Sequence, residues 1–186
     1  MTDLIENKKG FVGPTFSISN RICRTFWQIT WILLARWTPP PLHLWRVLIL
    51  RIFGAKISFK AYIYADVKIW APWNLVMEEH ATLGRGVICY NIDTVKIGKK
   101  SVISQYSHLC TGTHDYCKSS FALYSKPITI GDFVWICANT FVGPGVVIGD
   151  GAILSSGGVT HNNLNPWTIY RGNPAVVFKS RPAITD

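Results

Sequence analysis

The sequence is short of the features that mark several common protein classes. Within the apolar stretch that begins at Asn20, the longest uncharged segment is the 11 residues from Thr25 to Ala35, well short of the ~20 that a membrane-spanning helix needs. The five cysteines are an odd number without a Cys-x-x-Cys pair, which favours reduced thiols in a cytosolic protein. Residues 1–19 lack the basic, apolar and small-residue order of a signal peptide. These absences argue against a membrane-spanning protein and against a secreted, disulfide-rich one.

Acidic residues are also scarce. Ten Asp and Glu stand against 19 Lys and Arg, which gives a formal net charge of +9. Such a balance predicts an anionic partner, whether nucleic acid, a membrane surface or a phosphorylated ligand. The basic residues are scattered and form no recognised nucleic-acid motif, so we expect no nucleic-acid partner.

An aliphatic residue returns at every sixth position of the C-terminal half. In the stretch 130–159 these residues are Ile130, Ile136, Val142, Ile148 and Leu154. A helix repeats near 3.6 residues and a strand near 2, so a six-residue period matches neither element alone. It matches a short strand and a turn, three of which make a triangular coil of about 18 residues with glycines at corners of unusual backbone angle. The sequence therefore predicts a mainly β protein, a left-handed parallel β-helix.

The same repeat sets the expected domain boundaries. It begins near Ile57 and slips by two residues after Leu75 and again after Val95, which suggests bulged corners. The step fails from His114 to Pro127, which predicts a protruding loop at 114–127, and loops on rigid scaffolds tend to carry function. We expect a lead-in at 1–19, a helical segment at 20–54, the β-helix at 55–164, and a C-terminal segment at 165–186 that leaves the coil and folds back.

Tryptophan and arginine alternate through residues 20–53. Two helices are predicted here, the first with Asn20 as its N-cap and a stop at the prolines 39–41, the second from Leu42 to Phe53 with an end at Gly54. Interleaved tryptophans and arginines favour a peripheral contact with a membrane surface. The alternative is that both helices pack on the β-helix or on a neighbouring subunit. The expected location is cytoplasmic, with peripheral attachment to the inner face of the bacterial plasma membrane left open.

His114 is the first residue of the interruption. A histidine at the coil edge reaches solvent, and its neutral imidazole suits removal of a proton from an alcohol or amine near pH 7. Either Asp115 or a backbone carbonyl could orient the ring. Asn91 lies about one coil below, and because parallel strands are ~4.8 Å apart the two side chains could converge on one hydroxyl. The alternative makes His114 a loop residue and Asn91 a structural corner amide.

An ordered set of motifs surrounds His114. It comprises Tyr90-Asn91, Ile97-Gly98, Ser104-Gln105, Leu109 to Tyr116, Lys126-Pro127-Ile128, Val134-Trp135-Ile136, Val142 to Val146, Pro166-Trp167 and Gly172 to Ala175. With this set the chain resembles the hexapeptide-repeat O-acetyltransferases, above all the colanic-acid-biosynthesis type of bacterial polysaccharide pathways. Maltose, galactoside and nodulation-factor acetyltransferases are more distant in pattern. The similarity spans residues 50–181.

The resemblance implies a homotrimer with active sites between neighbouring subunits, acetyl-CoA as co-substrate and no metal. His114 would be the general base that deprotonates the acceptor for direct attack on the thioester, and Asn91 would hold the acceptor hydroxyl. Asp93, Asp115 and Tyr116 would be further contacts of the carbohydrate.

The resemblance also places the coenzyme. Trp135, Ala138, Ser156 and Gly157 would line the channel for the pantetheine arm, with the Ala138 N–H at the thioester oxyanion. Two basic residues, Lys179 and Arg181, are assigned to the phosphates of coenzyme A on their charge alone.

The predicted activity is O-acetyl transfer to a sugar hydroxyl of a polysaccharide or glycolipid intermediate, with a lipid-linked acceptor favoured by the basic, Trp-rich helices. Two alternatives remain, N-acetyl transfer to an amino-sugar nucleotide and a non-catalytic trimeric scaffold. A zinc site of the γ-carbonic-anhydrase kind is not expected. Such a site needs three histidines close enough in space to bind one zinc ion. His108 and His114 are predicted on adjacent faces of the coil, and His80 and His161 lie far from both.

Overall fold

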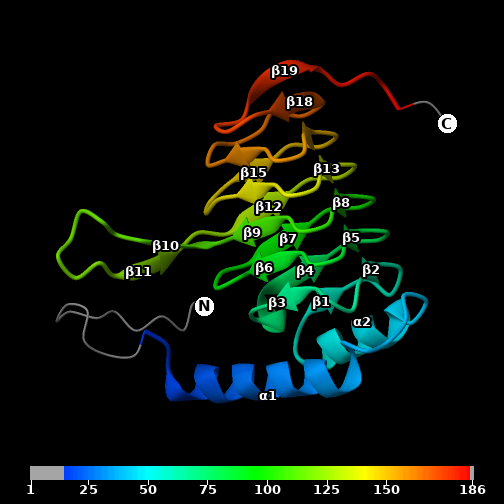
Figure 1. The fold of residues 1–186 in the computed structure, drawn as a ribbon, viewed down its shortest axis with the longest axis vertical. Helices are drawn as coiled ribbons and strands as arrows, with labels where there is room; N and C mark the ends of the chain where they lie inside the picture. The colour runs from blue at the N-terminus through cyan, green and yellow to red at the C-terminus, as the bar shows by residue number, and fades with distance from the viewer. Residues whose placement is uncertain (1–14, 185–186) are drawn as a thin grey trace.

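The computed structural model describes residues 15–184, which form a parallel β-helix with two helices across its N-terminal end (Figure 1). Short strands stack into three faces. The first face is β1 (Lys56–Ile57), β4 (Leu75–Met77), β7 (Val95–Ile97), β12 (Ile128–Ile130) and β15 (Val147–Ile148). The second face is β2 (Tyr62–Ile63), β5 (Thr82–Leu83), β8 (Val102–Ile103), β13 (Trp135–Ile136), β16 (Ile153–Leu154), β18 (Thr168–Arg171) and β19 (Val176–Ser180). The third face is β3 (Lys68–Ile69), β6 (Ile88–Tyr90), β9 (His108–Cys110), β14 (Phe141–Val142) and β17 (Val159–Thr160).

The slips in the six-residue step are extra residues at one corner, as predicted. Lys56 pairs with Val76 and Val76 with Lys96, so these coils hold 20 residues, whereas Thr129 pairs with Val147, a coil of 18. The additional residues lie where the third face turns into the first. The 3-10 helix η1 (Pro72–Asn74) occupies this corner in one coil.

The core runs along the axis of the coil and receives one side chain from most strands. The buried inward residues include Ile57, Ile63, Leu83, Ile103, Leu109, Ile136, Val142 and Leu154. The glycines that follow the aliphatic residue have a different role from the expected one. At Gly149 a Cβ would lie 2.6 Å from the backbone nitrogen of Pro166, so close approach of the next coil excludes a side chain there. The positive φ values belong instead to other corner residues, among them Gly151 (+66°) and Asn139 (+57°).

Two helices cover the N-terminal end of the coil. The first, α1 (Ile18–Leu34), is capped by Ser17, whose hydroxyl accepts from the Asn20 N–H at 3.2 Å. Asn20 is therefore not the N-cap; it lies inside the helix, buried, where it accepts from Arg24. The second, α2 (His43–Ile52), follows the prolines and ends before Gly54, as predicted. No helix within residues 15–184 is long and apolar enough to cross a membrane.

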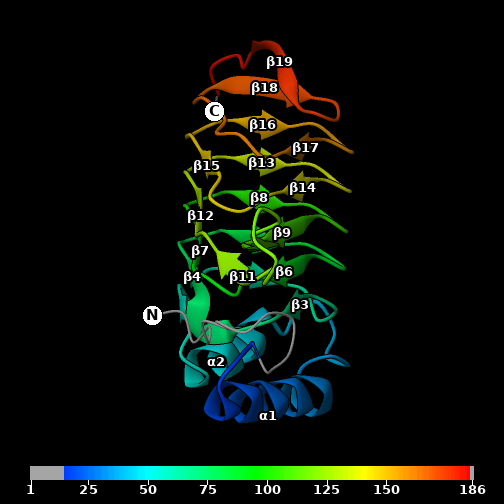
Figure 2. The ribbon, with the colours of Figure 1, turned by 90° about the vertical axis from the view of Figure 1, so that its left-hand side faces the viewer.

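The predicted loop is a β-hairpin. Strands β10 (Gly112–His114) and β11 (Leu123–Ser125) pair antiparallel and extend away from the coil between β9 and β12 (Figures 1 and 2). The hairpin starts from the corner between the third and first faces, where the coils below hold their extra residues. That corner is therefore where the coil accepts insertions.

The coil continues beyond the expected boundary at residue 164. Strand β18 stacks in parallel on β16, with Tyr170 beside Leu154. Only β19 folds back, antiparallel to β18. The fold-back is thus confined to the residues after Arg171, because Ile169 and Tyr170 still complete a coil.

Candidate active site

The hairpin holds His114 in a fixed orientation. Its exposed ring stacks on Phe121, with centroids 4.6 Å apart and planes 14° from parallel. Nδ1 lies 2.7 Å from the Phe121 carbonyl oxygen. A carbonyl only accepts, so Nδ1 carries the proton and the neutral ring keeps a free lone pair on Nε2. This is the tautomer that a general base needs.

Asp115 does not orient the histidine. Its carboxylate accepts from the Cys117 N–H at 3.2 Å and pairs with Lys118 at 3.2 Å, both within the turn of the hairpin. Of the two orienting groups left open by the sequence, the backbone carbonyl holds the ring. Tyr116 lies in the same turn with 83% of its surface exposed. Neither side chain has a hydrogen bond to His114 in the described structure.

Asn91 is a correction to the sequence-based interpretation. It is fully buried, its Oδ1 accepts from the Ala71 N–H at 3.0 Å, and its Nδ2 donates to the Ala71 carbonyl at 2.6 Å. Both polar ends are therefore engaged with the coil below, and full burial leaves neither end accessible to an acceptor hydroxyl. Asn91 and His114 do not converge, because the hairpin carries His114 away from the coil.

Asp93 lies at the base of the hairpin. Its Oδ1 accepts from the Thr94 N–H at 2.7 Å, and its Oδ2 is 3.4 Å from the Ser125 hydroxyl on β11. It is only partly buried. Both carboxylate oxygens are thus engaged within the chain, at a position next to the hairpin.

A second group of predicted residues meets on the second face. Trp135, 48% exposed, lines a hollow of about 470 Å³ together with Lys100, Phe133 and Arg181. The Trp135 indole donates to the Ser104 hydroxyl at 3.0 Å, and Arg181 donates to the carbonyls of Phe133 (2.7 Å) and Gly151 (2.9 Å). Lys100 was not predicted from the sequence as a site residue. The signal that could have identified it is a basic residue at the corner of the coil, one coil below Phe133.

Ala138, Ser156 and Gly157 stack at the corner between the second and third faces. The Gly157 N–H donates to the Ala138 carbonyl at 3.0 Å, and Ser156 and Gly157 are exposed. A Cβ on Gly157 would meet no atom within 4 Å, so the backbone there is open to a ligand. The Ala138 N–H has no hydrogen-bond partner among residues 15–184. Lys179 is exposed on β19 and does not line the hollow beside Trp135.

The hairpin with His114 and the hollow beside Trp135 lie on opposite sides of one chain. The hairpin leaves the corner between the third and first faces, opposite the second face that carries β13 and β8 (Figure 1). A single chain therefore separates His114 from Trp135.

Sequence comparison identifies the family. The family "bacterial transferase hexapeptide (six repeats)" matches residues 127–162. The Escherichia coli K12 protein named "Putative colanic acid biosynthesis acetyltransferase WcaF" is 39% identical over 178 residues, which cover 95% of this chain and 98% of that protein. The chain belongs to the hexapeptide-repeat acetyltransferases. The predicted family and enzyme class are confirmed.

Solved structures agree with the fold of a hexapeptide-repeat acetyltransferase. One is the VCA0836 acetyltransferase of Vibrio cholerae complexed with acetyl-CoA, at a TM-score of 0.80, 20% identity, 94% of this chain and 96% of that one. Another is a maltose O-acetyltransferase of Clostridium difficile 630, at a TM-score of 0.76, 23% identity and 90% of both chains. The predicted left-handed parallel β-helix is confirmed by this likeness.

Three thiols of this hexapeptide-repeat acetyltransferase are unsuited to covalent catalysis. Burial raises the pKa of Cys89 to about 12 and also raises the pKa values of Cys110 and Cys137. The thiolate is the nucleophilic form of cysteine, so these three side chains stay protonated and inert near pH 7. Among residues 15–184 no cluster of His, Cys, Asp or Glu could hold a metal ion.

Proposed function

We propose that the chain transfers the acetyl group of acetyl-CoA to a hydroxyl of a carbohydrate, with His114 as general base. The observation that carries this proposal is the hydrogen bond from Nδ1 to the Phe121 carbonyl, which leaves Nε2 as a proton acceptor on an exposed hairpin. The VCA0836 structure contains acetyl-CoA. The name of the E. coli relative refers to colanic acid biosynthesis, which supports a polysaccharide or a glycolipid intermediate as acceptor.

The reaction is a direct transfer. Nε2 of His114 takes the proton of the acceptor hydroxyl while its oxygen forms a bond to the thioester carbonyl carbon. The carbonyl oxygen gains negative charge, and the unpartnered Ala138 N–H is a donor suited to it. The C–S bond then breaks, and the sulfur leaves with the proton held by the imidazolium. Because burial keeps Cys89, Cys110 and Cys137 protonated, none of these three thiols would carry the acetyl group.

The active site is shared between subunits of a homotrimer. The separation of the hairpin from the second face within one chain supports this arrangement, because one subunit would supply His114 and its neighbour the coenzyme face. Asp93, Asp115 and Tyr116 would contact the acceptor from the hairpin side. Trp135, Ala138, Ser156 and Gly157 would hold the pantetheine arm, and Lys100, Lys179 and Arg181 would meet the phosphates.

Release of coenzyme A from acetyl-CoA with a panel of oligosaccharide acceptors tests the base. We expect His114→Ala to lower the rate by roughly 10²-fold or more while the protein remains folded. His80→Asn is the matched control: His80 is also an exposed histidine, its positive φ of 59° is tolerated by asparagine, and it lies in a coil far from the hairpin. Full activity of His114→Ala would refute the assignment.

Mixing two inactive variants tests the shared site. His114→Ala removes the base, and Ser156→Trp blocks the exposed corner of the coenzyme face. In mixed trimers some sites pair an intact hairpin with an intact face, and for equal mixing roughly a quarter of all sites do so. We expect activity to return in the mixture to about that fraction. No return of activity in demonstrably mixed trimers would contradict a site between subunits.

We also propose a peripheral membrane contact through residues 20–53. Packing on the coil, the alternative to this contact, accounts for only one side of the helices. Trp27 and Trp31 are buried against the coil, while an outward apolar face remains: Ile18, Ile22, Phe26, Ile29, Ile32, Leu33, Trp37, Leu44, Trp45, Leu48 and Ile52. No acidic residue occurs between Glu6 and Asp66, so this face meets an anionic surface without repulsion.

Vesicle flotation tests this contact. The paired substitution Ile22→Ser and Phe26→Ser is expected to abolish binding to anionic vesicles, because both side chains are exposed on α1. Val176→Ser and Val177→Ser, equally exposed on β19 at the other end of the coil, form the control. Equal flotation of both double variants would remove the support for this contact.

A further inference from the structure

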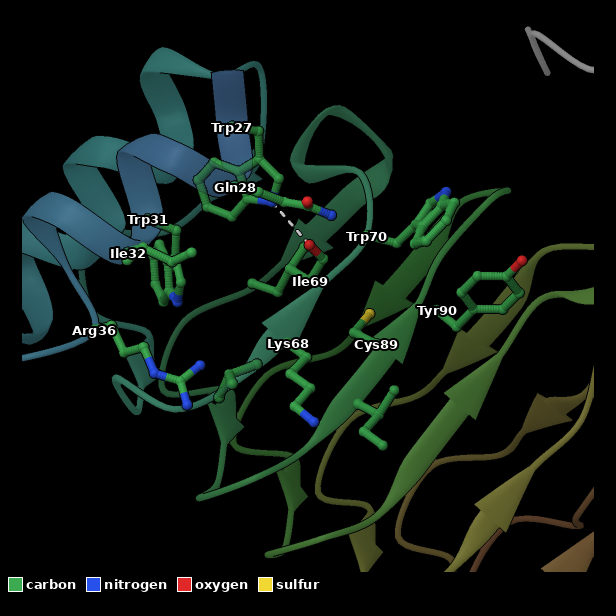
Figure 3. Close-up of a pocket in the computed structure, with 12 residues that line it drawn as sticks. Trp27, Gln28, Trp31, Ile32, Arg36, Lys68, Ile69, Trp70, Cys89 and Tyr90 are labelled. Carbon is green, nitrogen blue, oxygen red and sulfur yellow. Dashed lines mark hydrogen bonds between the residues drawn. The ribbon is translucent and has the colours of Figure 1, made fainter. Parts of the chain in front are cut away.

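A hollow of about 350 Å³ lies between α1 and the third face, within the ~300–1,000 Å³ range of small-molecule sites (Figure 3). Its walls include four aromatic side chains. Trp27 and Trp31 contribute from the helix, and Trp70 and Tyr90 from the coil. The two coil residues pack edge to face, with centroids 4.9 Å apart. The hollow shares no lining residue with the hollow beside Trp135. Tyr90, in its wall, lies next to Gly112 at the base of the hairpin.

One polar atom in this wall has no partner. Trp31 is 7% exposed, and its indole N–H is buried without a hydrogen-bond acceptor in the described part of the chain. The neighbouring Trp27 indole donates to the Ile69 carbonyl at 2.8 Å, and the Trp37 and Trp45 indoles donate to carbonyls of α1. A buried N–H without an acceptor is costly, so its retention indicates an acceptor that the chain does not supply.

The hollow is positively charged. Arg36 and Lys68 line it, and no Asp or Glu does. In Figure 3 the nitrogen of Trp31 lies on the side of its ring that faces Arg36 and Lys68. Arg24 adds a third cation beside the wall, its guanidinium 4.1 Å from the Trp70 ring. An indole donor with two flanking cations suits a phosphate oxygen.

The hollow also joins the outward apolar face of α1. Ile32 lines the hollow and is 56% exposed on that face. A molecule with a phosphate beside Trp31 could therefore continue along Ile32 with a hydrocarbon chain. Phosphate at one end and hydrocarbon at the other is the chemistry of a membrane lipid.

We propose that this hollow binds the phosphate group and the adjoining hydrocarbon of a phosphate-bearing membrane lipid. The proposal deepens the proposed membrane contact and rests on it, but it does not depend on acetyl transfer. Trp31 and Lys68 hold the phosphate, and the aromatic wall with Ile32 covers the first part of the chain. The site thereby anchors the N-terminal end of the coil at the lipid surface.

Binding of soluble short-chain lipids to the full chain tests the proposal. The probes are dioctanoyl phosphatidic acid, farnesyl phosphate, dioctanoylglycerol and inorganic phosphate, each titrated calorimetrically. We expect one or both phosphate lipids to bind, and which of them binds tells a diacyl lipid from an isoprenoid one. Dioctanoylglycerol lacks the phosphate and inorganic phosphate lacks the chain, so both are expected to bind at least tenfold more weakly. Inorganic phosphate binding as tightly as the lipids would overturn the proposal in favour of a free-anion site.

Two variants isolate the polar contacts. Trp31→Phe removes the N–H and keeps the aromatic wall, and we expect roughly tenfold weaker lipid binding at unchanged or higher thermal stability. Lys68→Gln is expected to weaken binding similarly, whereas Lys96→Gln, an exposed lysine on the first face, should leave it unchanged. Equal lipid binding by the wild type and Trp31→Phe would overturn the proposal.

The remaining outcomes separate this site from the other proposals. If Trp31→Phe changes the mass of the assembly rather than lipid binding, the hollow is a subunit contact and the proposal is wrong. Acetyl transfer to a soluble oligosaccharide is measured on the same samples. Loss of lipid binding with normal transfer overturns only the lipid site, and lipid binding without transfer to any acceptor overturns only the enzymatic assignment.

Discussion

Substituting Asn91 by leucine separates a structural role from a catalytic one. Leucine branches at the same carbon as asparagine but offers no polar atom, so the buried Ala71 N–H loses its acceptor. A buried unsatisfied N–H costs about 1–3 kcal/mol. The Ala71 carbonyl keeps a second donor, the Asn74 N–H at 3.0 Å, so its loss is limited to one hydrogen bond of about 0.5–1.5 kcal/mol.

The two contributions together give a destabilisation of about 2–4 kcal/mol. For a chain of 150–250 residues each kcal/mol shifts the unfolding midpoint by about 2–4 °C. We therefore expect Asn91→Leu to unfold about 5–15 °C below the wild type in calorimetry at equal protein concentration. Asn162→Leu is the control, because this asparagine is exposed and its side chain makes no hydrogen bond in the described structure.

The activity of the same variant decides the question. If Asn91 only clamps Ala71, the rate of coenzyme A release per folded protein, measured well below the unfolding midpoint, stays within a few-fold of wild type. A loss of 10²-fold or more with an unchanged midpoint would refute the structural role and restore the acceptor contact expected from the sequence.

Three further predictions concern stability. Arg46 is fully buried and donates to the carbonyls of Ile63, Pro39 and Pro40; Arg46→Lys offers three donors at one point instead of a planar fork, and the free energy of unfolding in urea should fall by about 2 kcal/mol. Burial lowers the pKa of His108 below its ordinary 6.5, so the unfolded chain binds more protons as the pH falls through that value; stability should decline from pH 7 to pH 5, and the decline should be smaller in His108→Phe. Gly149→Ala should lower the unfolding midpoint although φ there is ordinary, because its Cβ would lie 2.6 Å from the Pro166 nitrogen; a midpoint equal to the wild type would contradict this close approach.

The sequence alone determined the parts of this protein that repeat. One inward aliphatic residue per strand requires a six-residue step, so the β-helix, its slips and its interruption at His114 can all be predicted from spacing. The Trp- and Arg-rich helices could also be predicted, because the prolines and the glycine that end them are local signals. The motifs around His114 were sufficient to predict the family.

The tertiary structure decided which polar atoms remain free. Asn91 and His114 look equally available in the sequence, but pairing across coils buries Asn91 on Ala71, 20 residues away, while the hairpin exposes His114. The orienting carbonyl of Phe121 and the unpartnered indole of Trp31 carry no sequence signal either, because each depends on how separate segments pack. The placement of the hairpin and Trp135 on opposite sides follows from the triangular closure of the coil, which no local pattern encodes.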